Sequence, residues 1–297
     1  MTRVAESARW FLFAVQADDA RRATYARWIA RFRRGEVEAR QRAASTLAAA
    51  TTTIPQSTGY VACPPGTLGG VDAVVAEVQR LRDTALRASP DTKPYLVDYP
   101  ITALDASSPL LRFALSDDVL VPASQYLGLV PILTMVTVLA SPYLDSPQLA
   151  GSQLFHCDWE DRRQVKVFVH CSDVADANGP LTAVAADAST RVKRAVGYHY
   201  GGPAFRLRDD DVLPRVDTTE VTPFVGPAGA VTFLDTSSCL HYGSRVQPGA
   251  HERLVLQLQF LTPTAFDLVR LDHSKRPFRA VAGDFSPQQR LALGATP

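Results

Sequence analysis

Residues 153–161 read Gln-Leu-Phe-His-Cys-Asp-Trp-Glu-Asp, and the interpretation of the whole chain depends on this stretch. Side chains alternate between the two faces of an extended strand, so His156 and Asp158 share one face and Cys157 takes the other. An imidazole and a carboxylate on one face are two corners of a metal site. A 2-His-1-carboxylate iron site needs one more histidine and leaves other coordination positions open. Because His-x-Asp occurs by chance in many proteins, a third ligand has to be found elsewhere.

The composition is that of a globular protein. The chain has 297 residues, of which 46% are hydrophobic and 21% charged, so it can form a sizeable core. The net charge of +1 gives no case for nucleic acid or an anionic membrane surface as partner. The four cysteines lack CxxC spacing and fit a reduced, cytoplasmic protein: Cys63, Cys157, Cys171 and Cys239.

No targeting or membrane-spanning segment is expected. The longest apolar run, residues 126–144, approaches the length of a membrane span. It is interrupted by Gly128, Pro131 and Pro142, and its centre is rich in β-branched residues. The pattern therefore predicts a helix end followed by a buried strand at 132–140.

The first 130 residues are mostly helical by pattern. Helices are expected in residues 1–50, at 71–88, at 110–115 and at 116–127, separated by a Gly- and Pro-rich loop at 54–70 with a short strand at 60–63 and by an irregular segment at 89–100.

The helix around residues 23–32 carries aromatic and apolar side chains at Tyr25, Trp28, Ile29 and Phe32, with arginines on its other sides. It could grip an acidic partner or a membrane surface. We favour a solvated helix that packs on the domain through its aromatic stripe, because acidic residues follow and the net charge is near zero.

From residue 149 onward, short β-rich runs alternate with turn residues. Strands are expected at 152–158, 165–171, 180–184, 219–225, 230–233 and 254–261, with a weak helix candidate at 186–196. Many short strands of this kind predict a sandwich or barrel. Helices can pack on one face of such a β core, so we expect a single α+β domain whose core is mainly β.

A third ligand and a candidate anion anchor follow late in the chain. His241 lies after the strand at 230–233, and Arg253 begins a strand that runs to Phe260. Arg253 shares one strand face with Val255, Gln257 and Gln259. The opposite face is wholly apolar and is expected to pack on helices or on a second sheet.

In this order of features, the sequence resembles the phytanoyl-CoA dioxygenase-like branch of the Fe(II)/2-oxoglutarate oxygenases. The features are Gln153-Leu-Phe-His-Cys-Asp158, the strand from Lys166, the segment Asn178-Gly-Pro-Leu181, a glycine turn at Gly229, His241 and Arg253. Together they span about residues 151–260. The Pro-Gly-Ser-His-like turn that many relatives carry is absent, since residues 185–189 read Ala-Ala-Asp-Ala-Ser.

The resemblance implies a double-stranded β-helix, a jelly-roll or cupin-like barrel, buttressed by helices from the N-terminal half. It places a β-helix core at residues 131–265 of a single oxygenase domain, between the helical part at 1–130 and a C-terminal extension at 266–297.

The resemblance also implies the ligands and the chemistry. His156, Asp158 and His241 match the iron ligands, and Arg253 matches the residue that binds the distal carboxylate of 2-oxoglutarate. A guanidinium suits that task because it donates two parallel hydrogen bonds to a carboxylate. With Fe(II), 2-oxoglutarate and O2, the expected reaction is hydroxylation of a small molecule with release of succinate and CO2. Family halogenases replace the carboxylate ligand with a small residue, and Asp158 is retained here.

Other residues are weaker candidates. Lys166, Phe168 and His170 alternate onto one strand face, which lines the co-substrate site if it points inward and is solvated if it points outward. Gln153 is a candidate for a hydrogen bond to co-substrate or substrate. Arg245 competes with Arg253 as the carboxylate anchor, but it lies in a loop, and strands position a side chain more rigidly.

Two alternatives stay open at this level: a non-catalytic cupin-like barrel that binds a metal or small molecule, and a lyase or isomerase on the same scaffold. Loss of turnover on substituting Asp158, and dependence on 2-oxoglutarate, separate these classes from an oxygenase. The sequence does not identify the substrate. The loops 54–70 and 198–214 and the N-terminal helices are expected to shape its pocket.

Overall fold

The computed structural model describes residues 18–84, 94–99, 101, 104–146, 148–200, 205–266 and 283–295. The start of the predicted N-terminal helical region, the last four residues predicted for the helix at 71–88 and most of the C-terminal extension lie outside these ranges. The described chain is a mixture of helices and antiparallel strands.

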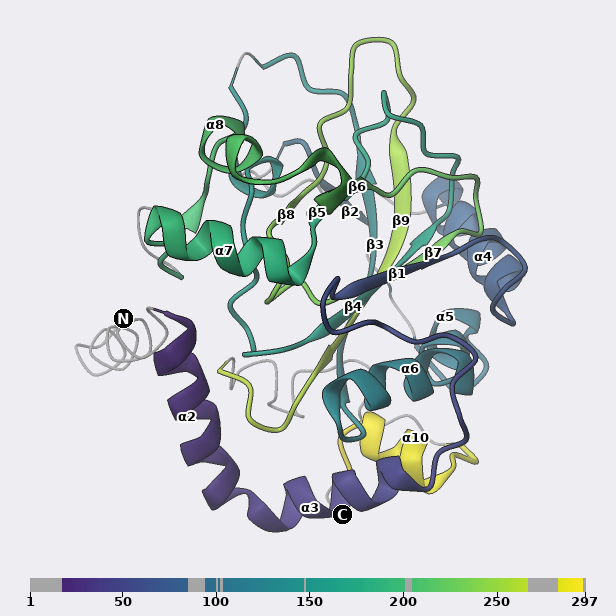
Figure 1. Cartoon of the computed structure of the whole chain (residues 1–297). Coiled ribbons are helices and arrows are strands. Elements are labelled where there is room, and N and C mark those ends of the chain that lie inside the picture. The colour runs from purple at the N-terminus through teal and green to yellow at the C-terminus, as the bar shows by residue number, and fades with distance from the viewer. Residues whose placement is uncertain are drawn as a thin grey trace, which may run out of the picture.

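The largest element is a six-stranded antiparallel sheet. Its strands are ordered β1 (Tyr60–Cys63), β7 (Val231–Leu234), β4 (Val165–His170), β9 (Arg253–Leu261), β3 (Ile132–Ser141) and β2 (Val97–Tyr99). β1 and β2, both from the first hundred residues, therefore form the two edges of this sheet (Figure 1). β2 falls inside the segment that we expected to be irregular, so that expectation was wrong for residues 97–99.

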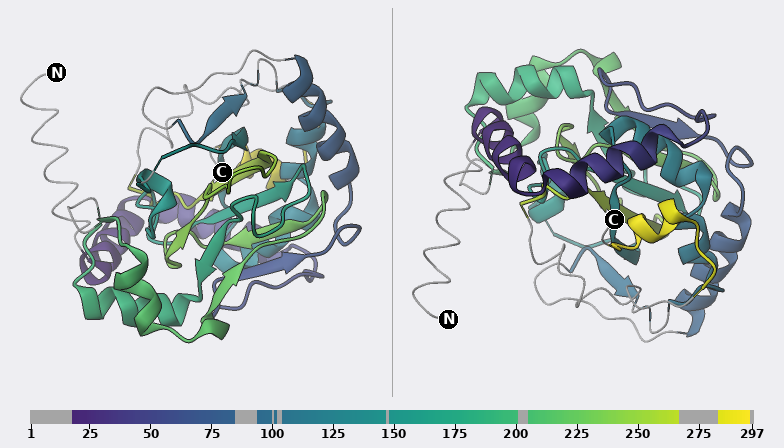
Figure 2. Two further views of the ribbon diagram at one scale, coloured as in Figure 1. Left: turned by 90° about the horizontal axis from the view of Figure 1, so that it is seen from above. Right: turned by 90° about the horizontal axis from the view of Figure 1, so that it is seen from below.

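One face of this sheet is apolar and covered by helices. Leu254, Leu256, Leu258 and Phe260 of β9 are at most 1% exposed. They share a core with α4 (Val71–Thr84), α5 (Pro109–Ala114), α6 (Asp117–Leu127) and α10 (Pro287–Ala292), as Figures 1 and 2 show. Burying each such side chain is worth about 1.5–3 kcal/mol. The prediction that this strand face packs on helices or a second sheet is confirmed.

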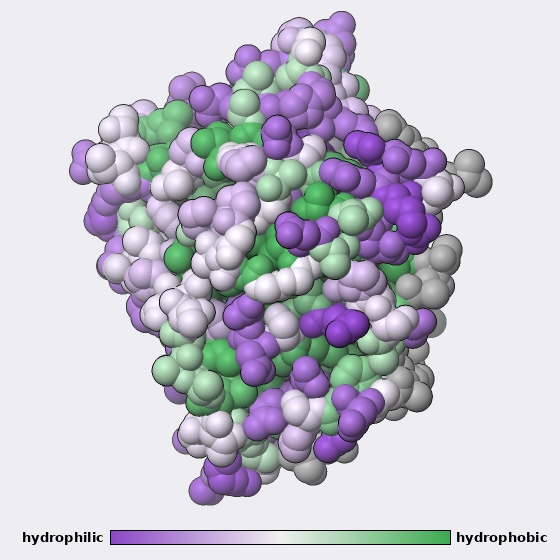
Figure 3. Space-filling model, turned by 90° about the vertical axis from the view of Figure 1, so that its right-hand side faces the viewer, coloured by the Kyte–Doolittle hydropathy of each residue, from purple (hydrophilic) through white to green (hydrophobic). Residues whose placement is uncertain are grey.

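The outer surface on this side is mixed. Figure 3 shows hydrophilic residues spread over it between smaller apolar areas. In α4 the buried positions are Val71, Val74, Val78 and Leu81, which follow the helical period and leave the remaining positions to solvent.

A smaller, three-stranded sheet lies across the open face of the large one. Its order is β6 (Val221–Pro223), β5 (Thr182–Val184) and β8 (His241–Tyr242). The weak helix candidate at 186–196 is realised as α7 (Ala186–Val196), beside α8 (Asp209–Val212). Gly179 makes the turn before β5 at φ +63°, and a Cβ there would lie 2.5 Å from the backbone nitrogen of Arg245. A glycine is required for that approach.

The strand expected at 152–158 does not form. Residues Gly151–Gln153 make a single 3-10 turn, and pairing is limited to isolated bridges, Phe155 with Leu207 and His156 with His241. The bridge to β8 nevertheless keeps His156 extended beside the small sheet.

The N-terminal helices are α2 (Asp19–Phe32) and α3 (Arg34–Ser45). The prediction that α2 packs through its aromatic stripe holds only in part: the Tyr25 ring centroid lies 5.2 Å from that of Phe266, but Trp28 is 52% and Phe32 72% exposed. Arg22 is buried instead, donating to the backbone carbonyls of Trp159 and Asp161. Carbonyl partners satisfy its guanidinium, so an arginine can enter where an aromatic side chain was expected.

Across the described segments, no helix has the length and apolarity needed to cross a membrane. The apolar run at 126–144 consists of the end of α6 and strand β3, as the sequence predicted.

Candidate metal centre

Three predicted ligands meet between the two sheets. One ligand atom from each of His156, Asp158 and His241 lies within 4.8 Å of the others. His241 comes from β8, and His156 comes from the segment bridged to it, with reciprocal backbone hydrogen bonds of 3.0 and 2.9 Å. Asp158 follows two residues later, and its amide donates to the Thr236 carbonyl at 2.7 Å. Backbone pairing thus places the two imidazoles side by side, with ring centroids 4.3 Å apart.

Both imidazoles are oriented by local backbone. His156 Nδ1 lies 2.9 Å from the Leu154 carbonyl, and His241 Nδ1 lies 3.0 Å from the Cys239 carbonyl. Because a carbonyl can only accept, Nδ1 carries the proton in each ring and Nε2 keeps its lone pair. The two Nε2 atoms face the Asp158 carboxylate, each at 3.8 Å from one of its oxygens. Metal-binding histidines are commonly oriented in this way.

Burial sets the protonation of the ligands. It holds the pKa of His156 well below its ordinary value, helped by nearby His241 and Arg206, and it also lowers the pKa of His241. Burial opposes ionisation of Asp158, but the Lys166 ammonium outweighs it and holds the pKa of that carboxyl below its usual range, and the two imidazoles add to this effect when they are protonated. The site therefore presents two neutral imidazoles and one carboxylate near neutral pH.

This donor set fits a divalent transition metal such as iron. Two imidazole nitrogens and one carboxylate oxygen form a facial triad and leave coordination positions open. Cys157 and Cys239 are fully buried in hydrophobic clusters. Burial raises the pKa of Cys157 to about 12 and that of Cys239 well above its ordinary value, so both remain thiols.

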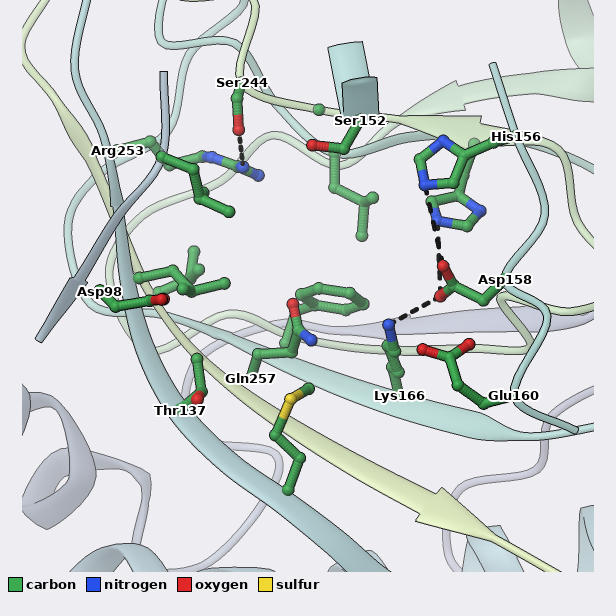
Figure 4. Close-up of a pocket in the computed structure, with 18 of the residues that line it drawn as sticks. Asp98, Thr137, Ser152, His156, Asp158, Glu160, Lys166, Ser244, Arg253 and Gln257 are labelled. Carbon is green, nitrogen blue, oxygen red and sulfur yellow. Dashed lines mark hydrogen bonds and ion pairs between the residues drawn. The ribbon is translucent and has the colours of Figure 1, made fainter. Parts of the chain in front are cut away.

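The three ligands line a cavity of about 550 Å³ between the sheets (Figure 4). Its other lining residues are Leu96, Asp98, Met135, Thr137, Leu139, Ser152, Trp159, Glu160, Lys166, Phe168, Leu181, Phe205, Arg206, Gly243, Ser244, Arg253, Val255 and Gln257.

Arg253 lies in this cavity, away from the three ligands (Figure 4). It is 6% exposed, and its Nη2 is 3.3 Å from the hydroxyls of both Ser141 and Ser244. Its Nε is buried without a hydrogen-bond partner. Burial lowers the pKa of Arg253 to about 10, which still leaves a full positive charge at neutral pH. A buried guanidinium without a carboxylate is costly, so this end of the cavity is suited to bind an anion.

Ser244 supports the Arg253 end in a strained backbone conformation. Its φ of +64° is the one positive φ of a non-glycine residue in the described chain. The hydroxyl lies 2.8 Å from that of Ser141, and the carbonyl accepts from Gln153 Nε2 at 2.9 Å. Such strain costs about 1–3 kcal/mol and concentrates at functional sites.

Of the weaker candidates from the sequence, two line the cavity and two do not. Lys166 and Phe168 line the cavity, and Lys166 Nζ lies 2.7 Å from Asp158 Oδ2. His170 is buried beyond the lining, with Nδ1 unpartnered. The Gln153 amide is held by backbone, since its Oε1 accepts from Ala150 N and its Nε2 donates to Ser244. The co-substrate roles of these residues stay predictions.

Arg245, the alternative anchor, is already engaged. It makes two hydrogen bonds with the Asp209 carboxylate at 2.8 and 2.9 Å, and its guanidinium lies 3.4 Å from the Tyr242 ring centroid. Arg253 has no such partner among the described carboxylates.

Several lining residues escaped the sequence analysis. Asp98 lies on β2, and Thr137 lies on β3 opposite Gln257. The alternation of Met135, Thr137 and Leu139 along a strand was the available signal for β3. Arg206 and Phe205 come from the loop at 198–214, as expected for a pocket-shaping loop, whereas the loop at 54–70 and the described N-terminal helices contribute no lining residue.

The chain is similar to known proteins in fold but not detectably in sequence. No protein-family model matches the chain, and no curated protein sequence matches it. Two solved structures share its fold with a TM-score of 0.50. The epimerase SnoN, solved with Fe3+, alpha-ketoglutarate and nogalamycin RO, is 17% identical over 77% of this chain and 85% of its own. The alpha-ketoglutarate-dependent carbocyclase SnoK from nogalamycin biosynthesis is 14% identical over 74% and 85%.

The chain thus shares its fold with these two enzymes. At these identities the similarity concerns the fold, and the chemistry has to be argued from the site.

Proposed function

We propose that this chain is an Fe(II)- and 2-oxoglutarate-dependent dioxygenase that hydroxylates a small molecule, of the phytanoyl-CoA dioxygenase-like branch, on one double-stranded β-helix domain. The observation that carries the proposal is the joint presence, in one cavity, of the group His156, Asp158 and His241 and a buried Arg253 that has no carboxylate partner among the described residues. SnoN, which shares the fold, was crystallised with iron and alpha-ketoglutarate.

Each residue has a defined task in this proposal. His156, Asp158 and His241 would hold Fe(II) on one face and leave the opposite positions open. Arg253, with the hydroxyls of Ser141 and Ser244, would receive the distal carboxylate of 2-oxoglutarate. Iron and 2-oxoglutarate would supply an oxidant from O2, with release of succinate and CO2. Phe168, Leu181 and Val255 give that region apolar walls.

Anaerobic addition of Fe(II) and 2-oxoglutarate tests the proposal directly. A weak visible charge-transfer band is expected, together with succinate formation on admitting O2. The Asp158→Ala variant should lose both. Folded protein that shows neither band nor succinate rules out the oxygenase and favours a metal- or ligand-binding barrel.

Hydroxylation is the default outcome because the carboxylate ligand Asp158 is present. SnoN and SnoK are an epimerase and a carbocyclase. Product analysis by mass spectrometry therefore decides the reaction type. A gain of one oxygen atom supports hydroxylation. A product of unchanged mass indicates isomerisation, and a loss of two hydrogens indicates desaturation or ring closure.

A further inference from the structure

Lys166 contacts a metal ligand that it does not neighbour in the sequence. It lies on β4, opposite Leu234 of β7 and Gln259 of β9, with its side chain on the cavity side of the sheet. From there it reaches Asp158, with Nζ 2.7 Å from Oδ2 (Figure 4). The two side chains are 11% and 13% exposed, so the pair is largely shielded from water.

The two oxygens of Asp158 have different neighbours. Oδ1 lies 3.8 Å from His156 Nε2, whereas Oδ2 lies 3.8 Å from His241 Nε2 and 2.7 Å from Lys166. A separation of 3.8 Å is too long for a hydrogen bond and leaves room for an ion between each imidazole and the carboxylate. Lys166 thus pairs with Oδ2, on the side of His241, whereas Oδ1 lies on the side of His156.

We propose that Lys166 is a positioning residue that holds Oδ2 of Asp158, so that the carboxylate offers a single oxygen to the metal. This rests on the proposed function. In a six-coordinate metal site, two imidazoles and one carboxylate oxygen would fill three positions and leave three for 2-oxoglutarate and O2. A carboxylate that bound through both oxygens would take a fourth position and compete with one of them.

The surroundings of Lys166 favour this role. A buried ammonium without a carboxylate is strongly destabilising, so Lys166 stays on Asp158 whether or not metal is present. The neighbouring carboxylate of Glu160 accepts a hydrogen bond from Gln164 Nε2 at 3.3 Å. Among the described residues, no hydrogen bond to the Asp158 carboxylate from another side chain takes the place of the lysine contact.

Metal affinity tests the proposal without turnover. Removing a group that orients a metal-bound carboxylate typically weakens metal binding roughly 10- to 100-fold. Lys166→Met, which keeps the length and removes the donor, should lose that much Co(II) affinity in a titration followed by the visible d–d bands, and its anaerobic Fe(II)–2-oxoglutarate band should weaken. Lys166→Arg should restore most of both. Gln125→Met, a similar change at an exposed position of α6 outside the cavity, is the control and should resemble wild type.

Equal Co(II) affinity and an unchanged spectrum in Lys166→Met would overturn the inference. If wild-type protein binds no Co(II), the proposed function itself fails, which is a different result. A crystal structure of the wild-type Co(II) complex adds a readout that needs no variant. It should show Asp158 binding through one oxygen with Lys166 on the other, and a carboxylate bound through both oxygens would contradict the proposal.

Discussion

Arg253 keeps its charge among buried side chains, and the two serine hydroxyls that it contacts carry no compensating charge. A group of this kind lowers the stability of the empty protein, because a desolvated charge needs a charged or well hydrogen-bonded partner. The cost is recovered when an anion binds. Stability and binding should therefore respond in opposite directions when this side chain is changed.

Arg253→Met should weaken 2-oxoglutarate binding roughly 100-fold, equivalent to about 3 kcal/mol, because charge-assisted hydrogen bonds to the distal carboxylate are lost. The melting temperature of the metal-free variant should equal or exceed that of wild type. The dissociation constant comes from anaerobic titration of the Fe(II)–2-oxoglutarate band, and the melting temperature from calorimetry.

Arg253→Lys is the control for charge, since it keeps the cation but not the planar pair of donors. It should fall between wild type and Arg253→Met. Unchanged 2-oxoglutarate affinity in Arg253→Met would remove Arg253 from the proposal.

His170 gives the protein a pH-dependent stability. Burial, with nearby Arg253, lowers the pKa of His170 to about 4, against about 6.5 in the unfolded chain. The unfolded state thus binds a proton between these values and the folded state does not. The resulting stabilisation is complete above pH 6.5 and is lost as the pH falls toward 4.

His170→Gln keeps hydrogen-bonding atoms but does not titrate. Between pH 7 and pH 5, wild type should lose about 2 kcal/mol more unfolding free energy than the variant, which is 1.36 kcal/mol for each of about 1.5 pH units below 6.5. Urea unfolding at the two pH values measures the difference. Parallel losses in both proteins would show that His170 is not the group responsible.

At the scale of elements, Arg22 joins α2 to the backbone that follows Asp158. Arg22 donates to the carbonyls of Trp159 and Asp161, which closely follow Asp158, and its guanidinium lies 3.8 Å from the Tyr200 ring centroid. Asp19, one turn earlier, pairs with buried Lys193 of α7 at 3.0 Å. The helix thus braces the backbone that carries Asp158.

Arg22→Ala should destabilise the protein by about 3 kcal/mol, because two hydrogen bonds from a charged donor and the contact with the Tyr200 ring are lost. Arg31→Ala on the same helix, where the side chain is exposed, should change stability by less than about 0.5 kcal/mol. Chemical denaturation compares the two. If the two variants had similar free energies of unfolding, α2 would not unfold together with the rest of the domain.

The sequence predicted some elements better than others for physical reasons. Strands with one fully apolar face, such as β9, and helices with a clear period, such as α4, were predicted within a few residues. β2 has three residues and was hidden among prolines. The segment 152–158 carries a strand-like pattern, but it has single bridge partners instead of a continuous neighbour, so it forms no strand. Arg22 was missed because pattern analysis places arginines at the surface.

At the scale of the whole molecule, the metal site joins distant parts of the chain. His156 and Asp158 lie far from His241 in sequence, and β4, β9 and β3 form the opposite wall of the cavity. The sequence predicted His156, Asp158, His241 and Arg253 as a set through the ordered features of the family resemblance, and the structure brings all four into one cavity. Asp98, Thr137 and Glu160 could not be found, because their facing depends on how the two sheets lie against each other.

Metal binding should stabilise the whole fold. A ligand present at 100 times its dissociation constant adds about 2.7 kcal/mol, so Co(II) should raise the melting temperature of wild type, and excess chelator should reverse the rise. Asp158→Ala should show no such shift. A shift that persists in Asp158→Ala would indicate that the metal binds elsewhere.

The backbone contacts that orient the two imidazoles affect how far the surrounding sequence can change while the orientation is kept. Each ring is fixed by the carbonyl two residues before it, at Leu154 and at Cys239, and a carbonyl is present whatever side chain that residue carries. The tautomer therefore survives substitution of every neighbour that keeps the backbone in place. Beyond the ligands themselves, few side-chain identities are therefore needed to keep the two imidazoles in this orientation.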